Sequence, residues 1–167
     1  EIEYRAGNYQ RAIDALMRVR EQQPGMVPEL LPLLRDCFDA TGKRPKLRQL
    51  LEECLEQAPA SRLVVAIAEE ITLQESSEAA LEFLTAQVRL RPTLRSLLAA
   101  TRCYRETRAD VPAGPVAVLQ TALEKLVASK ATYRCTSCGF SGRQLHWLCP
   151  RCKSWNTVQP ILGVEGD

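Results

Sequence analysis

The stretch GNYQRAIDALMRVREQQP, residues 7–24, contains the pattern that decides the fold. A glycine and an aromatic residue open it, apolar residues follow at helical spacing, and a proline closes it. Three sets of positions keep this register at intervals of 35 and 33 residues: Pro24, Pro59 and Pro92; Ala12, Leu47 and Ala80; Leu16, Leu51 and Leu84. This agreement indicates a repeated unit of two helices.

The unit resembles the tetratricopeptide repeat, a helix-turn-helix of 34 residues. Apolar residues at helical spacing predict first helices around 30–38, 64–71 and 97–104, with partner helices at 43–57, 76–90 and 114–130. Gly42 and the pair Ser76-Ser77 separate the helices of a pair. We therefore expect a mainly α tetratricopeptide-repeat solenoid at 1–131, with one partial and three complete helical pairs. Each pair exposes an apolar face that only a neighbouring pair covers.

Composition marks a second region. Four of the nine aromatic residues lie in the last 35 residues, where short β-prone runs replace helix formers. We expect a small C-terminal β module at 132–167 that packs on the end of the array. The sequence contains no run of about 20 apolar residues, so it predicts no membrane span. Cys37, Cys54 and Cys103 lie among leucines or alanines and are predicted to be buried small side chains.

The module contains four cysteines as two Cys-x-x-Cys pairs, Cys135/Cys138 and Cys149/Cys152. Four thiolates at this spacing suit one zinc or iron ion in a tetrahedral site. Gly139 follows the first pair, where a positive φ turns backbone N–H groups toward sulfur. We expect an antiparallel ribbon built from residues 132–134, 144–147 and 155–158. The metal supplies much of the stability of so short a module.

The four-cysteine pattern also allows three other interpretations of the module. A single iron in four thiolates is redox-active, so electron transfer is one of them. His146 could replace a cysteine ligand. A nucleic-acid ribbon is disfavoured by charge, because four thiolates and a divalent ion offset the formal +2 of the side chains: Arg134, Arg143, Arg151 and Lys153 against Glu165 and Asp167. Residues 1–132 carry 18 basic and 18 acidic residues, so we expect no nucleic-acid partner.

The inward positions of the first helices predict a charged groove. It runs from acidic to basic and would orient a protein partner of opposite polarity. Its candidate partner-binding residues are Glu29, Asp36, Asp39, Arg62, Glu69, Arg95, Arg102 and Arg105. No set of residues with a catalytic pattern is present, and four thiolates leave no metal position for water. The sequence therefore predicts a non-enzyme.

Helical repeats that run into Cys-x-x-Cys-Gly-Phe and Trp-x-Cys-Pro-x-Cys-x-x-Trp resemble the C-terminal part of the lipopolysaccharide assembly protein B family of Gram-negative bacteria. The resemblance implies a rubredoxin-like metal domain whose ligands are Cys135, Cys138, Cys149 and Cys152. It implies cytoplasmic repeats tethered to the inner membrane by an N-terminal helix. The chain opens at Glu1, partway through a repeat, so we expect a soluble fragment whose anchor and first repeats lie upstream.

The resemblance also implies a role. Such a protein regulates lipopolysaccharide biosynthesis by bringing the lipid A deacetylase to a membrane protease for degradation. We therefore expect a non-catalytic adaptor at the cytoplasmic face of the inner membrane, with protein partners. The alternative is a rubredoxin-type electron-transfer module fused to a protein-docking repeat array.

Overall fold

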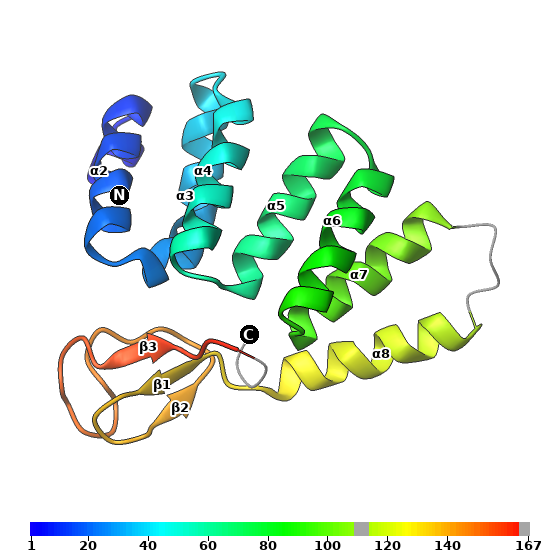
Figure 1. Cartoon of the computed structure of the whole chain (residues 1–167). Helices are drawn as coiled ribbons and strands as arrows, with labels where there is room; N and C mark the ends of the chain where they lie inside the picture. Colours follow the sequence, from blue (N-terminus) through cyan, green and yellow to red (C-terminus); the bar gives the residue numbers. More distant parts are fainter. Residues whose placement is uncertain (109–113, 164–167) are drawn as a thin grey trace. The chain divides into compact units, whose positions relative to one another are not determined.

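The computed structural model describes residues 1–108 and 114–163 (Figure 1). Contacts divide the chain into two compact units, Glu1–Ala79 and Ala80–Asp167. The division falls inside one helix.

The first unit is built from helices joined by short turns. They are α1 (Ile2–Arg5), α2 (Tyr9–Gln22), a short 3-10 helix (Pro24–Met26), α3 (Val27–Ala40), α4 (Arg44–Gln57) and α5 (Ser61–Gln74). Helix α2 packs on α3, α3 on α4, and α4 on α5. Each helix therefore lies beside its neighbours in sequence, as expected of a repeat array.

The predicted repeat period is confirmed by where the helices begin. Helices α2, α4 and α6 (Ser77–Leu90) start at 9, 44 and 77, while α3, α5 and α7 (Leu94–Thr107) start at 27, 61 and 94. Each of these six helices has 14 residues. The residues that keep the sequence register are all buried: Ala12, Leu47 and Ala80; Leu16, Leu51 and Leu84. The mainly α architecture with repeated helices is thus confirmed.

Local chemistry explains where the helices stop. Gly42 has φ +65°, and its N–H donates to Asp39 O while the next N–H, from Lys43, donates to Phe38 O. This pair of bonds satisfies carbonyls left open at the end of α3. Helix α6 begins after Ser76, whose hydroxyl accepts from the N–H of Ala79 at 3.1 Å. The predicted breaks at Gly42 and Ser76-Ser77 are confirmed.

The core of the first unit is apolar, and its cysteines behave as small core side chains. Leu34, Leu47, Leu63 and Ile67 are among the largest fully buried side chains. Cys37 and Cys54 are buried, as is Cys103 in α7. Burial raises the pKa of the Cys37 and Cys54 thiols, so these groups stay neutral. This outcome agrees with the prediction.

The second unit continues the pattern with α7 and α8 (Gly114–Ser129), which pack along each other. The predicted last partner helix, 114–130, is thus confirmed to within a residue. Helix α8 is rich in apolar residues, but only Leu123 is buried. Val118, Leu119 and Leu126 are exposed. The packing of the C-terminal module on the array stays a prediction, as do the domain limits 1–131 and 132–167.

The C-terminal module is a three-stranded antiparallel sheet in the order β2-β1-β3. Its strands are β1 (Tyr133–Cys135), β2 (Ser141–Gly142) and β3 (Val158–Pro160). The predicted strand at 144–147 is wrong, and the predicted strand at 155–158 lies instead at 158–160. The chain reverses directly after Gly139, so it pairs with β1 at residues 141–142. Tyr133, Cys135, Cys149 and Val158 form the buried core.

Candidate metal centre

The four cysteines of the module come together at one point. Their sulfur atoms all lie within 4.8 Å of one another. Sγ of Cys135 is 3.7 Å from Sγ of Cys152, and Sγ of Cys138 is 3.7 Å from Sγ of Cys149. Cys135 and Cys149 are buried, and the other two are partly exposed. The structure thus brings together every residue that the sequence predicts as a metal ligand.

These distances fit a metal ion. A tetrahedron with metal–sulfur bonds of about 2.3 Å has sulfur–sulfur edges of about 3.8 Å. The two 3.7 Å separations match such edges, and each joins one Cys-x-x-Cys loop to the other. Four sulfur ligands suit zinc and iron alike and close the coordination sphere. The four cysteines could therefore hold one metal ion.

The two Cys-x-x-Cys loops have the same backbone hydrogen bonds. In the first, Cys135 N–H donates to Phe140 O at 2.7 Å and Gly139 N–H donates to Cys135 O at 2.9 Å. In the second, Cys149 N–H donates to Ser154 O at 3.0 Å and Lys153 N–H donates to Cys149 O at 2.9 Å. Each loop is thus a tight hairpin that presents two sulfurs on one side.

The equivalence extends to backbone conformation. Gly139 has φ +73° and Lys153, at the same place in the second loop, has φ +59°. A positive φ was expected at Gly139. Sequence reasoning missed Lys153, because lysine gives no signal for this conformation and only the spacing from Cys152 hints at it. A side chain at positive φ is uncommon and costs about 1–2 kcal/mol.

Hydrogen bonds and burial shift the pKa values of the cysteine thiols in different directions. Ser154 lowers the pKa of Cys152 to about 6, first through its side chain and then through its N–H. The Thr157 hydroxyl, 3.2 Å from the Cys135 sulfur, lowers the pKa of that thiol. At Cys138 the hydrogen bond from Phe140 acts to lower the pKa, but burial and the neighbouring cysteines raise it to about 11.

Thiolates that form side by side also repel one another, so the four thiols do not all lose their protons easily on their own. A cation bound to all four sulfurs relieves that repulsion, so metal binding and loss of the thiol protons go together. His146 is not part of this cluster. Its ring lies edge-on to Phe140, with centroids 6.2 Å apart.

The predicted groove residues of the first unit are engaged in contacts between helices. Glu29 of α3 pairs with Arg62 of α5, and Glu69 of α5 pairs with Arg35 of α3. The partners lie 33 and 34 residues apart in sequence, one repeat period. Asp36 accepts from the Tyr4 hydroxyl at 2.7 Å, and Asp39 pairs with Arg44 at 2.7 Å. The structure thus places complementary charges side by side in neighbouring repeats.

The groove residues of the second unit lie on α7. Arg102 pairs with Glu124 of α8 at 2.9 Å, and Arg105 donates to Gln120 of α8 at 2.8 Å. Arg95 is half-buried near the start of α7. Whether these residues also bind a partner stays a prediction.

One charged residue escaped sequence reasoning. Glu70 of α5 is fully buried. Arg44 binds both of its oxygens, Nε to Oε2 at 3.0 Å and Nη2 to Oε1 at 3.1 Å, and Nε of Arg35 lies 3.7 Å from Oε1. The sequence pattern that could have predicted the burial of Glu70 is its position on the apolar face of its helix, four residues after buried Ala66 and three after buried Ile67.

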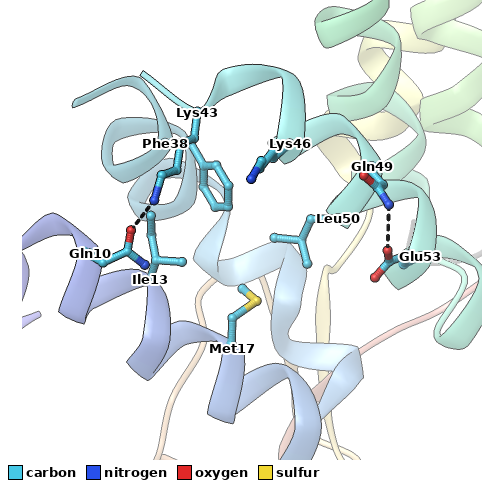
Figure 2. Close-up of a pocket in the computed structure, with 9 residues that line it drawn as sticks. All are labelled: Gln10, Ile13, Met17, Phe38, Lys43, Lys46, Gln49, Leu50 and Glu53. Carbon is cyan, nitrogen blue, oxygen red and sulfur yellow. Dashed lines mark hydrogen bonds between the residues drawn. The ribbon is translucent and has the colours of Figure 1, made fainter. Parts of the chain in front are cut away.

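A hollow of about 410 Å³ lies in the first unit (Figure 2). The centre of the hollow is lined by the apolar side chains of Ile13, Met17, Phe38 and Leu50. Its rim is formed by the polar side chains of Gln10, Lys43, Lys46, Gln49 and Glu53. Lys43 Nζ donates to Gln10 Oε1 at 2.6 Å. Ile13, Phe38 and Leu50 are themselves buried core residues, so the hollow is the open side of the packing between repeats.

None of the helices among the described residues is long and apolar enough to cross a bilayer.

Both the C-terminal module and the chain as a whole are similar in sequence to known proteins. Residues 133–160 match the rubredoxin metal binding domain family. Lipopolysaccharide assembly protein B of Escherichia coli is 31% identical over 161 residues, which cover 96% of this chain and 41% of that protein. The protein of the same name from Haemophilus influenzae is 27% identical over 163 residues, 95% of this chain and 40% of that protein.

The chain thus spans about two fifths of the length of these relatives. The metal-binding match covers all four cysteines of the cluster, and the longer alignments also include the helical repeats. Along nearly its whole length the chain is therefore a relative of lipopolysaccharide assembly protein B, with a rubredoxin-type metal-binding domain at residues 133–160.

Proposed function

We propose that the chain is part of a non-catalytic adaptor that regulates lipopolysaccharide biosynthesis. The observation that carries the proposal is the alignment with lipopolysaccharide assembly protein B over 96% of the chain. Its helical repeats, which we assign to the tetratricopeptide type, offer side chains for protein partners. A closed four-thiolate site provides no open position for substrate, which supports a role without catalysis.

The partners we propose come from the resemblance of the sequence. They are a membrane-bound protease and the deacetylase of the lipid A pathway, which the adaptor brings together at the cytoplasmic face of the inner membrane. In this proposal Cys135, Cys138, Cys149 and Cys152 hold one metal ion. The ion, when bound, ties the two Cys-x-x-Cys loops together and stabilises a module too small to fold on its core alone.

Capture of purified partners tests the adaptor role. The metal-loaded chain is immobilised and offered the deacetylase and the detergent-solubilised protease, separately and together. We expect the chain to retain both proteins in one complex. Failure to retain either of them at micromolar concentration would contradict the proposal.

The metal distinguishes the adaptor from an electron carrier. Zinc does not change oxidation state, so chains loaded with zinc and with iron should retain the deacetylase equally and support equal degradation of it. Degradation by the iron form alone, and only when the iron is reduced, would overturn the adaptor role and favour electron transfer.

The basic end of the predicted groove can be tested with a matched control. The double variant Arg102→Gln/Arg105→Gln removes two positive charges from α7, whereas Glu124→Gln removes the ion pair with Arg102 but leaves the charges of α7 in place. An acidic partner should bind the double variant more weakly and the control at least as well as the wild type. Equal capture by all three proteins would reject the groove.

A further inference from the structure

The second Cys-x-x-Cys loop forms a hairpin with an exposed apolar surface. Leu148 pairs with Trp155 across the hairpin, and Asn156 N–H donates to Trp147 O at 2.7 Å. Trp147 is 56% exposed, Leu148 40% and Trp155 72%. We call these three residues the knuckle patch. Leu148 and Trp155 are opposite each other in an antiparallel pair, so their side chains share one face of the hairpin, and Trp147, one residue earlier, belongs to the other face. Exposed large apolar side chains on a single small hairpin indicate a candidate binding surface.

The knuckle patch is not needed for the core of the module. That core is made by Tyr133, Cys135, Cys149 and Val158, with Phe140 and Leu145 packed against it. The two tryptophans stand outside this group and remain in water, although they are the only tryptophans in the chain. Burial of exposed indole rings is favourable, so a partner that covers them gains affinity.

The charges around the knuckle patch have one sign. Arg151 and Lys153 lie in the same hairpin and are both exposed. Residues 133–163 contain two more arginines and no Asp or Glu. With Glu165, Asp167 and the −2 of four thiolates and a divalent ion, the whole module has a formal charge of about zero, so the positive charge is local to this hairpin.

We propose that the knuckle patch binds the surface of an anionic phospholipid bilayer. Tryptophan rings settle at the level of the lipid headgroups, where one edge is apolar and the other is wet. Arg151 and Lys153 can then approach the lipid phosphates while their aliphatic stems lie along the apolar layer.

The small size of the hairpin favours a bilayer over a protein. Three apolar side chains offer little area, whereas stable protein interfaces bury about 800 Å² per partner. A bilayer interface deforms around a small apolar group and offers hydrocarbon and phosphate within a few ångströms. The proposal does not rest on the adaptor function, because it concerns only lipid binding by the module.

The two tryptophans make the test specific. The full chain loaded with zinc is titrated with vesicles of 70% phosphatidylcholine and 30% phosphatidylglycerol, and tryptophan emission is followed. Since both tryptophans belong to the knuckle patch, a shift to shorter wavelength reports on this surface. Co-flotation with the vesicles gives the bound fraction, and brominated lipids should quench the emission of the wild type.

Variants separate the apolar and ionic parts. Trp155→Ser should weaken vesicle binding about tenfold. Arg151→Gln and Lys153→Asn should each weaken it about fivefold, and asparagine tolerates the positive φ of position 153. Lys46→Gln, which removes an exposed lysine of α4, is the control and should bind as the wild type does. Metal content of one ion per chain verifies that each variant is folded.

Several outcomes would overturn the proposal. They are an unchanged emission spectrum at millimolar anionic lipid, equal binding to vesicles of phosphatidylcholine alone, and no quenching by brominated lipid. Binding that Arg151→Gln and Lys46→Gln weaken equally would also overturn it, because the attraction would then belong to the whole chain. The wild-type quenching measurement decides the matter even if a tryptophan variant loses its metal.

Discussion

Replacement of Arg44 by methionine should destabilise the helical array strongly. The change removes both hydrogen bonds to the buried Glu70 carboxylate, at 3.0 and 3.1 Å, and the pair of bonds to Asp39 at 2.7 and 2.8 Å. Glu70 is fully buried, so its charge then has only Arg35, at 3.7 Å, to compensate it. An uncompensated charge in this position is the dominant cost.

The magnitude follows from burial. Loss of one partner of a buried ion pair costs about 3–5 kcal/mol. The side chain of Arg44 is 36% exposed and Arg35 remains nearby, so we expect the lower end, about 3 kcal/mol. The double variant Arg44→Met/Glu70→Leu should recover most of that loss, because it removes the buried charge together with its partner.

Urea denaturation followed by circular dichroism at 222 nm measures these changes. Glu69→Gln is the matched control, because Glu69 is the neighbouring residue of the same helix and pairs with Arg35, yet its side chain is 53% exposed. It should cost at most about 1 kcal/mol. A loss below about 1 kcal/mol for Arg44→Met, or a double variant no more stable than that single variant, would refute the reasoning.

Three further predictions concern the metal-binding module. Gly139→Ala should weaken zinc binding by about 1 kcal/mol, because no atom lies within 4 Å of the added Cβ and only the positive φ of +73° opposes the substitution. Competition for zinc with a chromogenic chelator measures this change. Lys153→Gly should leave the zinc affinity equal or higher. In the metal-free protein, iodoacetamide should alkylate Cys152 faster than Cys138 at pH 7, because both are partly exposed, thiolates react and the pKa values are about 6 and about 11. The rate at Cys152 should fall as the pH drops through about 6, and equal rates at both sulfurs would contradict the hydrogen-bond argument. Removal of zinc by a chelator should abolish the near-ultraviolet signal of the module but keep most helical signal at 222 nm, whereas parallel loss of both would show that the array depends on the metal.

Much of the helical array could be predicted from sequence. The register of Ala12, Leu47 and Ala80 predicts the repeat period, because helix packing repeats the same small or apolar contact in each unit. Gly42 and Ser76 predict helix ends through their local hydrogen bonds. Such properties depend on neighbours within a few residues.

The cluster of four cysteines could be predicted for the same reason. Two Cys-x-x-Cys pairs are local patterns, and their ligand chemistry is independent of the rest of the chain. Their strands were harder to predict. β2 consists of Ser141 and Gly142, which have little strand preference, and its place is set by the tight reversal after Gly139.

The sequence by itself determined the repeated helices, their ends and the cluster of four cysteines, because each rests on spacing along the chain. Only the tertiary structure decided which charges meet. Glu29 finds Arg62 and Glu70 finds Arg44 because neighbouring helices lie side by side, at separations of 33 and 26 residues. The tertiary structure also decided that both tryptophans remain in water. These features depend on packing between distant segments, which no local pattern encodes.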